Sequence, residues 1–79
     1  MPPELKGFLL LGKTILVWKT SSEIDNEGFR ILRATKKRGP YESIGFEDSK
    51  KDATEEAIYS FVDKNAPKGK VYYKVVLWM

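Results

Sequence analysis

Few side chains of this sequence are suited to catalysis. Its 79 residues include neither cysteine nor histidine, which excludes disulfides, thiolate or imidazole metal ligands, cysteine nucleophiles and Ser–His dyads. Carboxylates are plentiful from Glu47 to Glu56, and two of them could act as general acid and base. Catalytic carboxylates need a rigid, partly dry pocket, whereas this segment has one apolar side chain, Ala53, and should be a mobile surface connection. We therefore expect no enzymatic activity, no catalytic residue and no cofactor.

The segment from Glu23 to Gly28 offers the oxygen ligands that calcium prefers. Its acidic and amide residues, Asp25, Asn26 and Glu27, begin like a calcium loop. The full Asp-x-Asn-x-Asn-Gly order is missing, however, and no glutamate follows at the distance of a bidentate ligand. A hydrogen-bonded turn is the simpler interpretation of Glu23 to Glu27, and we expect no metal site.

A basic run, Lys36, Lys37 and Arg38, could contact phosphates, and Tyr41 nearby could stack on a base. A solvated turn explains the run equally well. The net charge is only +3, acidic residues follow closely, and no RNA-binding signature is present. We do not expect nucleic-acid binding.

Three aromatic residues, Tyr41, Tyr72 and Trp78, could stack on sugar rings or anchor a protein partner. The alternative is that they are core or strand-pairing residues. Trp78 is distinctive, because a tryptophan this close to a chain end is seldom well buried without a neighbour. We expect Trp78 to lie in an interface.

The sequence predicts that the elements positioning these residues are β-strands. Apolar residues recur in short runs broken by Gly, Pro, Asn and Asp, and no long window has helical spacing. We expect strands at 5–11, 14–20, 29–34, 41–46, 58–63 and 71–79, with one helical turn near Asp52 and Glu55. About six strands with short turns form a sandwich or a barrel. The length allows a single domain, residues 1–79, with one core.

Composition adds weaker indications. No stretch approaches the roughly 18 apolar residues of a membrane span, and the first residues lack the cleavage site of a signal peptide. Glutamine is absent and charged residues make up 32% of the chain, which favours a thermophilic source.

Three segments together resemble a fibronectin type III domain. Residues 15–33 (ILVWKTSSEIDNEGFRILR) are similar to its B strand, BC loop and C strand. Residues 59–63 (YSFVD) resemble the E strand, and residues 69–75 (GKVYYKV) resemble the start of the F strand. The likeness is greatest to the bacterial and archaeal branch found in secreted and surface proteins, where Trp-x-Thr, Ser-Glu, Asp-Asn and Gly-Phe recur.

The resemblance implies an antiparallel immunoglobulin-like β-sandwich with Trp18 at the centre of its core. Packed around Trp18 it would place Phe29, Ile31, Tyr59, Phe61, Tyr73 and Val75. Tyr72 or Tyr73 would take the role of the tyrosine corner. It also implies an extracellular or cell-surface location.

The sequence departs from this family after the F strand, because no residues remain for a seventh strand. The segment from Val71 to Met79 would then be an open edge, which proteins normally protect. The first strand could swing over to cover it, a second copy could dock there, or the chain could be a piece of a larger protein. We expect pairing with another chain, that is, self-association through this edge. Its partner-binding residues would be Tyr72, Lys74, Val76 and Trp78, with Tyr41 nearby.

These inferences lead to a non-catalytic protein–protein interaction or spacer module. The alternative is an accessory carbohydrate-binding module, because the resemblance implies that such domains often accompany polysaccharide-degrading enzymes.

Overall fold

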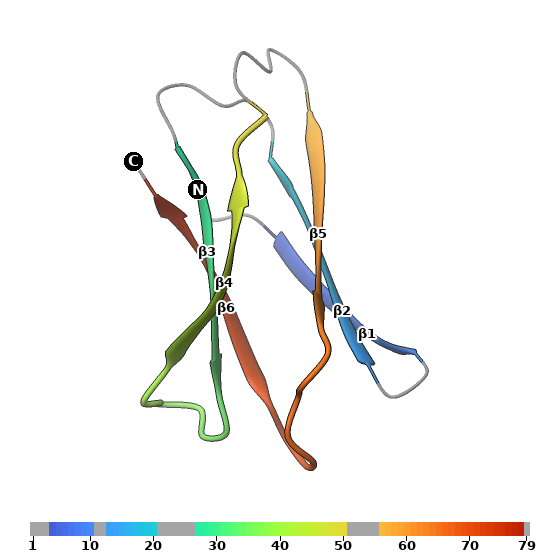
Figure 1. Cartoon of the computed structure of the whole chain (residues 1–79), viewed down its shortest axis with the longest axis vertical. Helices are drawn as coiled ribbons and strands as arrows, with labels where there is room; N and C mark the ends of the chain where they lie inside the picture. Colours follow the sequence, from blue (N-terminus) through green and yellow to red (C-terminus); the bar gives the residue numbers. More distant parts are fainter. Residues whose placement is uncertain (1–3, 11–12, 21–26, 51–55, 79) are drawn as a thin grey trace.

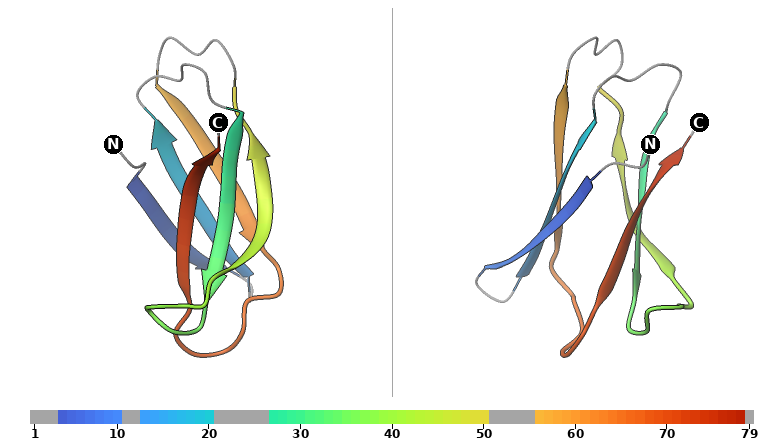
Figure 2. Two further views of the ribbon diagram at one scale, coloured as in Figure 1. Left: turned by 90° about the vertical axis from the view of Figure 1, so that its left-hand side faces the viewer. Right: turned by 180° about the vertical axis from the view of Figure 1, so that it is seen from behind.

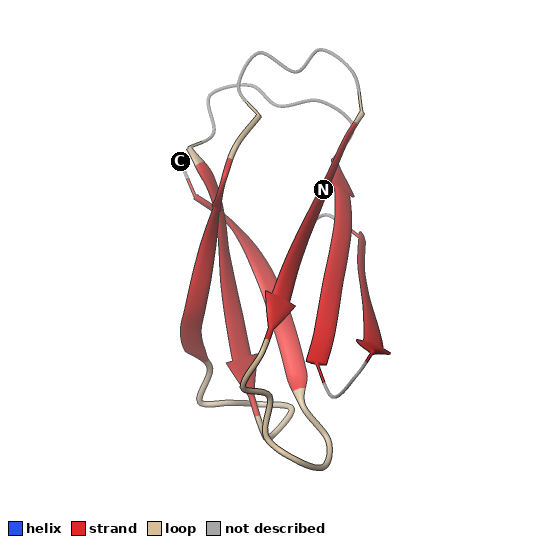
Figure 3. Ribbon diagram, turned by 45° about the vertical axis from the view of Figure 1, so that its right-hand side comes forward, coloured by secondary structure: helices blue, strands red, loops and turns tan. Residues whose placement is uncertain are grey.

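The residues that the structure describes form only strands and the loops between them. The structure, a computed structural model, describes residues 4–10, 13–20, 27–50 and 56–78 (Figure 1). These residues contain no helix, so none of them belongs to a helix that could cross a membrane (Figure 3). The strands are β1 (Glu4–Leu10), β2 (Lys13–Thr20), β3 (Gly28–Ala34), β4 (Glu42–Asp48), β5 (Ala57–Asp63) and β6 (Tyr72–Trp78).

The strands form two antiparallel sheets that pack face to face. Within the described residues, each sheet has three strands, in the orders β1-β2-β5 and β4-β3-β6. β4 contacts β5 across the sandwich, and β1 and β6 lie on the opposite side (Figure 2). The prediction of an all-β chain with antiparallel strands is therefore confirmed.

Aromatic rings fill the space between the sheets. Trp18 is 1% exposed and stacks on Tyr59 with 5.7 Å between ring centroids. Phe29, from the other sheet, meets both rings, at 5.7 Å from Trp18 and 4.7 Å from Tyr59. The predicted core around Trp18 is confirmed, since the buried or partly buried cluster includes Phe29, Ile31, Tyr59, Phe61, Tyr73 and Val75, with Leu16, Ile44 and Ala57 in addition.

The segment following Phe46 corrects one expectation. Residues 47–56 were expected to be a mobile connection, but β4 continues to Asp48, with Glu47 opposite Phe29 in the ladder. Ser49 and Lys50 are also held, because the Ser49 N–H donates to the Glu27 carbonyl at 3.1 Å and the Lys50 N–H donates to the Tyr59 hydroxyl at 2.9 Å. Backbone pairing tolerates charged side chains on an edge strand, so the lack of apolar residues was a poor guide. The expected helical turn at Asp52 and Glu55 falls outside the described residues.

Candidate interaction surface

The backbone of β6 is bonded on one side only in the part of the chain that the structure describes. β6 lies at the end of its sheet, beside β3. The Trp78 carbonyl points toward β3, because it accepts a hydrogen bond of 2.7 Å from the Glu27 N–H. On the other side of β3, the Glu27 carbonyl accepts from Ser49, beyond the end of β4. This alternation directs the backbone groups of Lys74, Val76 and Trp78 toward β3.

The intervening residues of β6 therefore direct their backbone groups away from the sheet. Tyr73, Val75 and Leu77 each present an N–H and a C=O to this side. We call this row of groups the free edge. Leu77 is opposite the buried Phe29, yet it is 46% exposed, because β6 ends its sheet among the described strands and none of them lies on this side of it. The free edge thus combines open hydrogen-bonding groups with apolar surface.

The solvent-facing side of the β4-β3-β6 sheet carries a cation held between aromatic rings. Arg30 is directly opposite Phe46 on β4 and Val76 on β6. Its guanidinium lies 4.6 Å from the ring centroid of Trp78 and 5.9 Å from that of Phe46. Phe46, Val76 and Trp78 are 39%, 41% and 47% exposed. We call this side the outer face.

Gly28 makes this arrangement of rings sterically feasible. It lies opposite Trp78 in the ladder, and an added Cβ would come within 2.6 Å of the Phe46 ring and would also clash with the Glu47 carbonyl. A side chain at position 28 would therefore displace Phe46 from the outer face. This close approach explains why a glycine begins β3.

The outer face brings together the residues predicted to bind a partner. Alternation along β6 places Tyr72, Lys74, Val76 and Trp78 on this one side. Tyr41 lies beside them, since the Lys74 ammonium sits 4.2 Å from the Tyr41 ring centroid. Whether these residues bind a partner remains a prediction.

Two residues of the outer face, Arg30 and Phe46, were not singled out from the sequence. Phe46 ends the expected fourth strand and Arg30 alternates with buried residues of the third. The available signal was this alternation, which places Arg30 on the side away from Phe29 and Ile31. The pairing of Arg30 with Phe46 and Trp78 depends on the register between strands, which no local pattern gives.

A second polar cluster ties the two sheets together. Arg33 Nη1 on β3 donates to both carboxylate oxygens of Asp63 on β5, at 2.9 and 3.0 Å. Arg33 Nη2 donates to Glu42 Oε1 at 3.1 Å. The Tyr73 hydroxyl donates to Asp63 Oδ2 at 2.7 Å. Tyr73 rather than Tyr72 thus bonds back to the preceding strand, and its acceptor is a side chain, whereas a tyrosine corner bonds to backbone.

The electrostatics of this cluster fit a structural clamp. Burial raises the pKa of Asp63, but hydrogen bonds from Tyr73, Arg33 and the Asn65 N–H outweigh it, so the pKa of Asp63 is lowered overall. Burial and the hydrogen bond to Asp63 raise the pKa of Tyr73. An open hollow lies beside the cluster, lined by Arg33, Glu42 and Asp63 among others. The charged groups beside this hollow bind one another. They are therefore better placed to hold the two sheets together than to exchange protons with a substrate.

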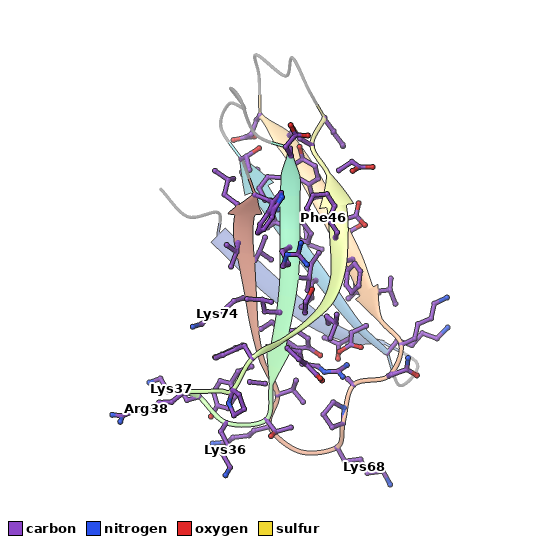
Figure 4. The ribbon with its side chains drawn as sticks, turned by 60° about the vertical axis from the view of Figure 1, so that its left-hand side comes forward. Lys36, Lys37, Arg38, Phe46, Lys68 and Lys74 are labelled. Atoms are coloured by element: carbon purple, nitrogen blue, oxygen red, sulfur yellow. The ribbon has the colours of Figure 1, made fainter. Side chains whose placement is uncertain are left out.

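The basic run lies at the end of the sandwich where the β3–β4 and β5–β6 loops meet. Lys36, Lys37 and Arg38 point outward there, with Lys68 from the other loop (Figure 4). The turn is ordered, since the Gly39 N–H donates to the Lys36 carbonyl at 2.9 Å and the Tyr41 hydroxyl donates to the Lys37 carbonyl at 2.8 Å.

The described residues contain no group of three acidic side chains able to hold a metal ion. The calcium-like segment from Glu23 to Glu27 falls outside the described residues except for Glu27.

Comparison of the chain with protein-family models, with curated proteins and with solved structures found no match.

Proposed function

We propose that this chain is a non-catalytic interaction module with an immunoglobulin-like sandwich of the fibronectin type III kind. In that fold strand B pairs with E, and C pairs with F, in separate sheets. The pairing of β2 with β5 and of β3 with β6 supports this assignment. An extracellular or cell-surface location is part of the proposal and rests on the sequence resemblance alone.

The binding surface of the module is the free edge of β6 together with the adjoining outer face. The observation that carries the proposal is that Tyr73, Val75 and Leu77 present backbone groups outward beside exposed Val76 and Trp78. An extended edge is a template for strand addition, in which backbone hydrogen bonds supply affinity and alternate side chains supply specificity.

The charge of β6 does not block strand addition. A lysine at an edge often prevents pairing, and Lys74 is the only charged residue of this strand. Its ammonium, however, rests on the Tyr41 ring on the outer face, away from the plane in which a new strand would bind. A second copy of the chain presents the same free edge, so it can supply the added strand.

Self-association through β6 is testable with a proline at position 77. Leu77→Pro removes one N–H from the free edge without removing a hydrogen bond to β3. We expect the wild-type protein to show a mass that rises with concentration in light scattering coupled to gel filtration, and the variant to remain monomeric and folded by circular dichroism.

A matched control lies in the other sheet. Ile58 is on the edge strand β5 and is 59% exposed, so Ile58→Ala should associate as the wild type does. A wild-type protein that stays monomeric at every concentration, or a Leu77→Pro variant that associates normally, would contradict the proposal.

Carbohydrate binding is a second candidate, favoured by the partly exposed rings of Phe46 and Trp78 on either side of Arg30. Aromatic faces stack on sugar rings, and a guanidinium can donate hydrogen bonds to hydroxyl groups. Affinity electrophoresis in soluble glycans separates the two functions. Retardation that is lost in Trp78→Ala would favour carbohydrate binding, and unretarded migration would favour the protein-binding module.

A further inference from the structure

We propose that two copies of this chain pair through antiparallel β6 strands whose Val75 residues lie opposite each other on a two-fold axis. This inference rests on the proposed function and specifies its partner and geometry. It predicts one continuous sheet that runs through both molecules, with their outer faces on the same side.

The first argument is the direction of the backbone groups. An antiparallel ladder requires residues with outward N–H and C=O groups to face one another. With the axis at Val75, Val75 faces the partner's Val75, and Tyr73 faces the partner's Leu77. Every residue of the free edge then exchanges both of its hydrogen bonds with an outward-pointing residue.

The second argument is the length of the ladder. Val75 is the middle residue of β6, which runs from Tyr72 to Trp78. An axis at Val75 therefore pairs the strand over its whole length, whereas each shift of the axis leaves residues at the ends unpaired.

The third argument is the side chains that become neighbours. On the outer face, Tyr72 would face the partner's Trp78, and Lys74 would face the partner's Val76. Aromatic pairs across strands are stabilising, and like charges directly opposite are destabilising. An axis at Lys74 would set two ammonium groups against each other, while the axis at Val75 keeps them apart.

The same register covers the apolar surface that the edge exposes. Leu77 belongs to the inner side of β6, opposite Phe29, and it would meet the partner's Tyr73. Removing exposed apolar surface from water favours association. Pairing with the partner strand would thus bury the Leu77 side chain, which is exposed to solvent in the single copy.

Cysteine cross-linking tests the register, because the natural sequence has no cysteine. Lys74 and Val76 are exposed residues of the outer face. In the proposed ladder, Lys74 of one copy faces Val76 of the other. The two residues form a pair without hydrogen bonds, in which the side chains are closer than in a hydrogen-bonded pair. We expect a mixture of Lys74→Cys and Val76→Cys proteins to form disulfide-linked heterodimers under mild oxidation. Each variant alone should cross-link much more slowly, because its own cysteines lie diagonally apart.

Other cross-linking patterns would overturn the register without overturning self-association. Rapid dimers of Lys74→Cys alone would place the axis at Lys74, and rapid dimers of Val76→Cys alone would place it at Val76. Ile58→Cys, on the edge of the other sheet, is the control for random collision. If the mixture cross-links no faster than this control while light scattering shows dimers, the interface lies elsewhere and the inference is wrong. If light scattering shows only monomers, the proposed self-association itself has failed.

Discussion

Replacing Trp18 with alanine is expected to lower the free energy of unfolding by about 3–5 kcal/mol. The side chain is 1% exposed, stacks on Tyr59 and meets the edge of Phe29 from the opposite sheet. Small domains have total stabilities of about 5–15 kcal/mol, so this variant should lose a large share of its stability and unfold at a much lower urea concentration than the wild type. Urea unfolding followed by circular dichroism measures the loss.

Two further variants separate the role of Trp18 from a general effect of mutation. Ile58→Ala removes an apolar side chain that is 59% exposed and should change the stability by less than about 0.5 kcal/mol. Trp18→Phe should lie between the two, since the indole Nε1 has no hydrogen-bond acceptor within the described residues and its loss leaves no acceptor unpaired. A Trp18→Ala protein as stable as Ile58→Ala would show that Trp18 is not the centre of the core.

Replacing Asp63 with alanine should be nearly as damaging, at about 3 kcal/mol. The substitution leaves the largely buried Arg33 guanidinium without its closest carboxylate and the Tyr73 hydroxyl without its acceptor. Lys19→Ala is the matched control, because it breaks the exposed pair between Lys19 and Glu56. Exposed pairs contribute only about 0–1 kcal/mol, so equal losses in the two variants would contradict the clamp.

The pH dependence of stability isolates the charge of Asp63. Because the folded protein lowers the pKa of Asp63, its contribution is fully present above the ordinary aspartate pKa of about 3.9 and is lost as the pH falls through the lower, folded value. The stability difference between wild type and Asp63→Asn should therefore be constant above about pH 5 and shrink in acid. A difference that persists unchanged in acid would show that shape, and not charge, sets the role of Asp63.

Most strand positions were predictable because they depend on local alternation, whereas the core around Trp18 was inferred from the resemblance. Leu16 and Trp18 share a face of one apolar run, and Phe29 and Ile31 share a face of another. The strand β4 was harder to delimit, because Glu47 and Asp48 are held by backbone pairing rather than by burial of their side chains. The distribution of apolar residues therefore predicted the buried parts of the strands more accurately than the residues at which the strands end.

Contacts between distant segments could not be predicted in the same way. Arg33 and Asp63 are thirty residues apart in sequence, and nothing near either residue identifies the other as its partner. The placement of Arg30 between Phe46 and Trp78 likewise requires three strands in one register. The sequence thus indicated most of the outer face through the alternation of β6, but not the cation at its centre.

Amide hydrogen exchange along β6 tests most directly whether its open side is covered by a second copy. In dilute protein, Lys74 and Val76 should exchange slowly because they bond to β3, and Tyr73, Val75 and Leu77 should exchange fast. Raising the protein concentration should slow exchange at these three residues and leave Lys74 and Val76 almost unchanged. Slow exchange of Tyr73, Val75 and Leu77 in dilute monomer, or fast exchange that concentration does not alter, would contradict this account.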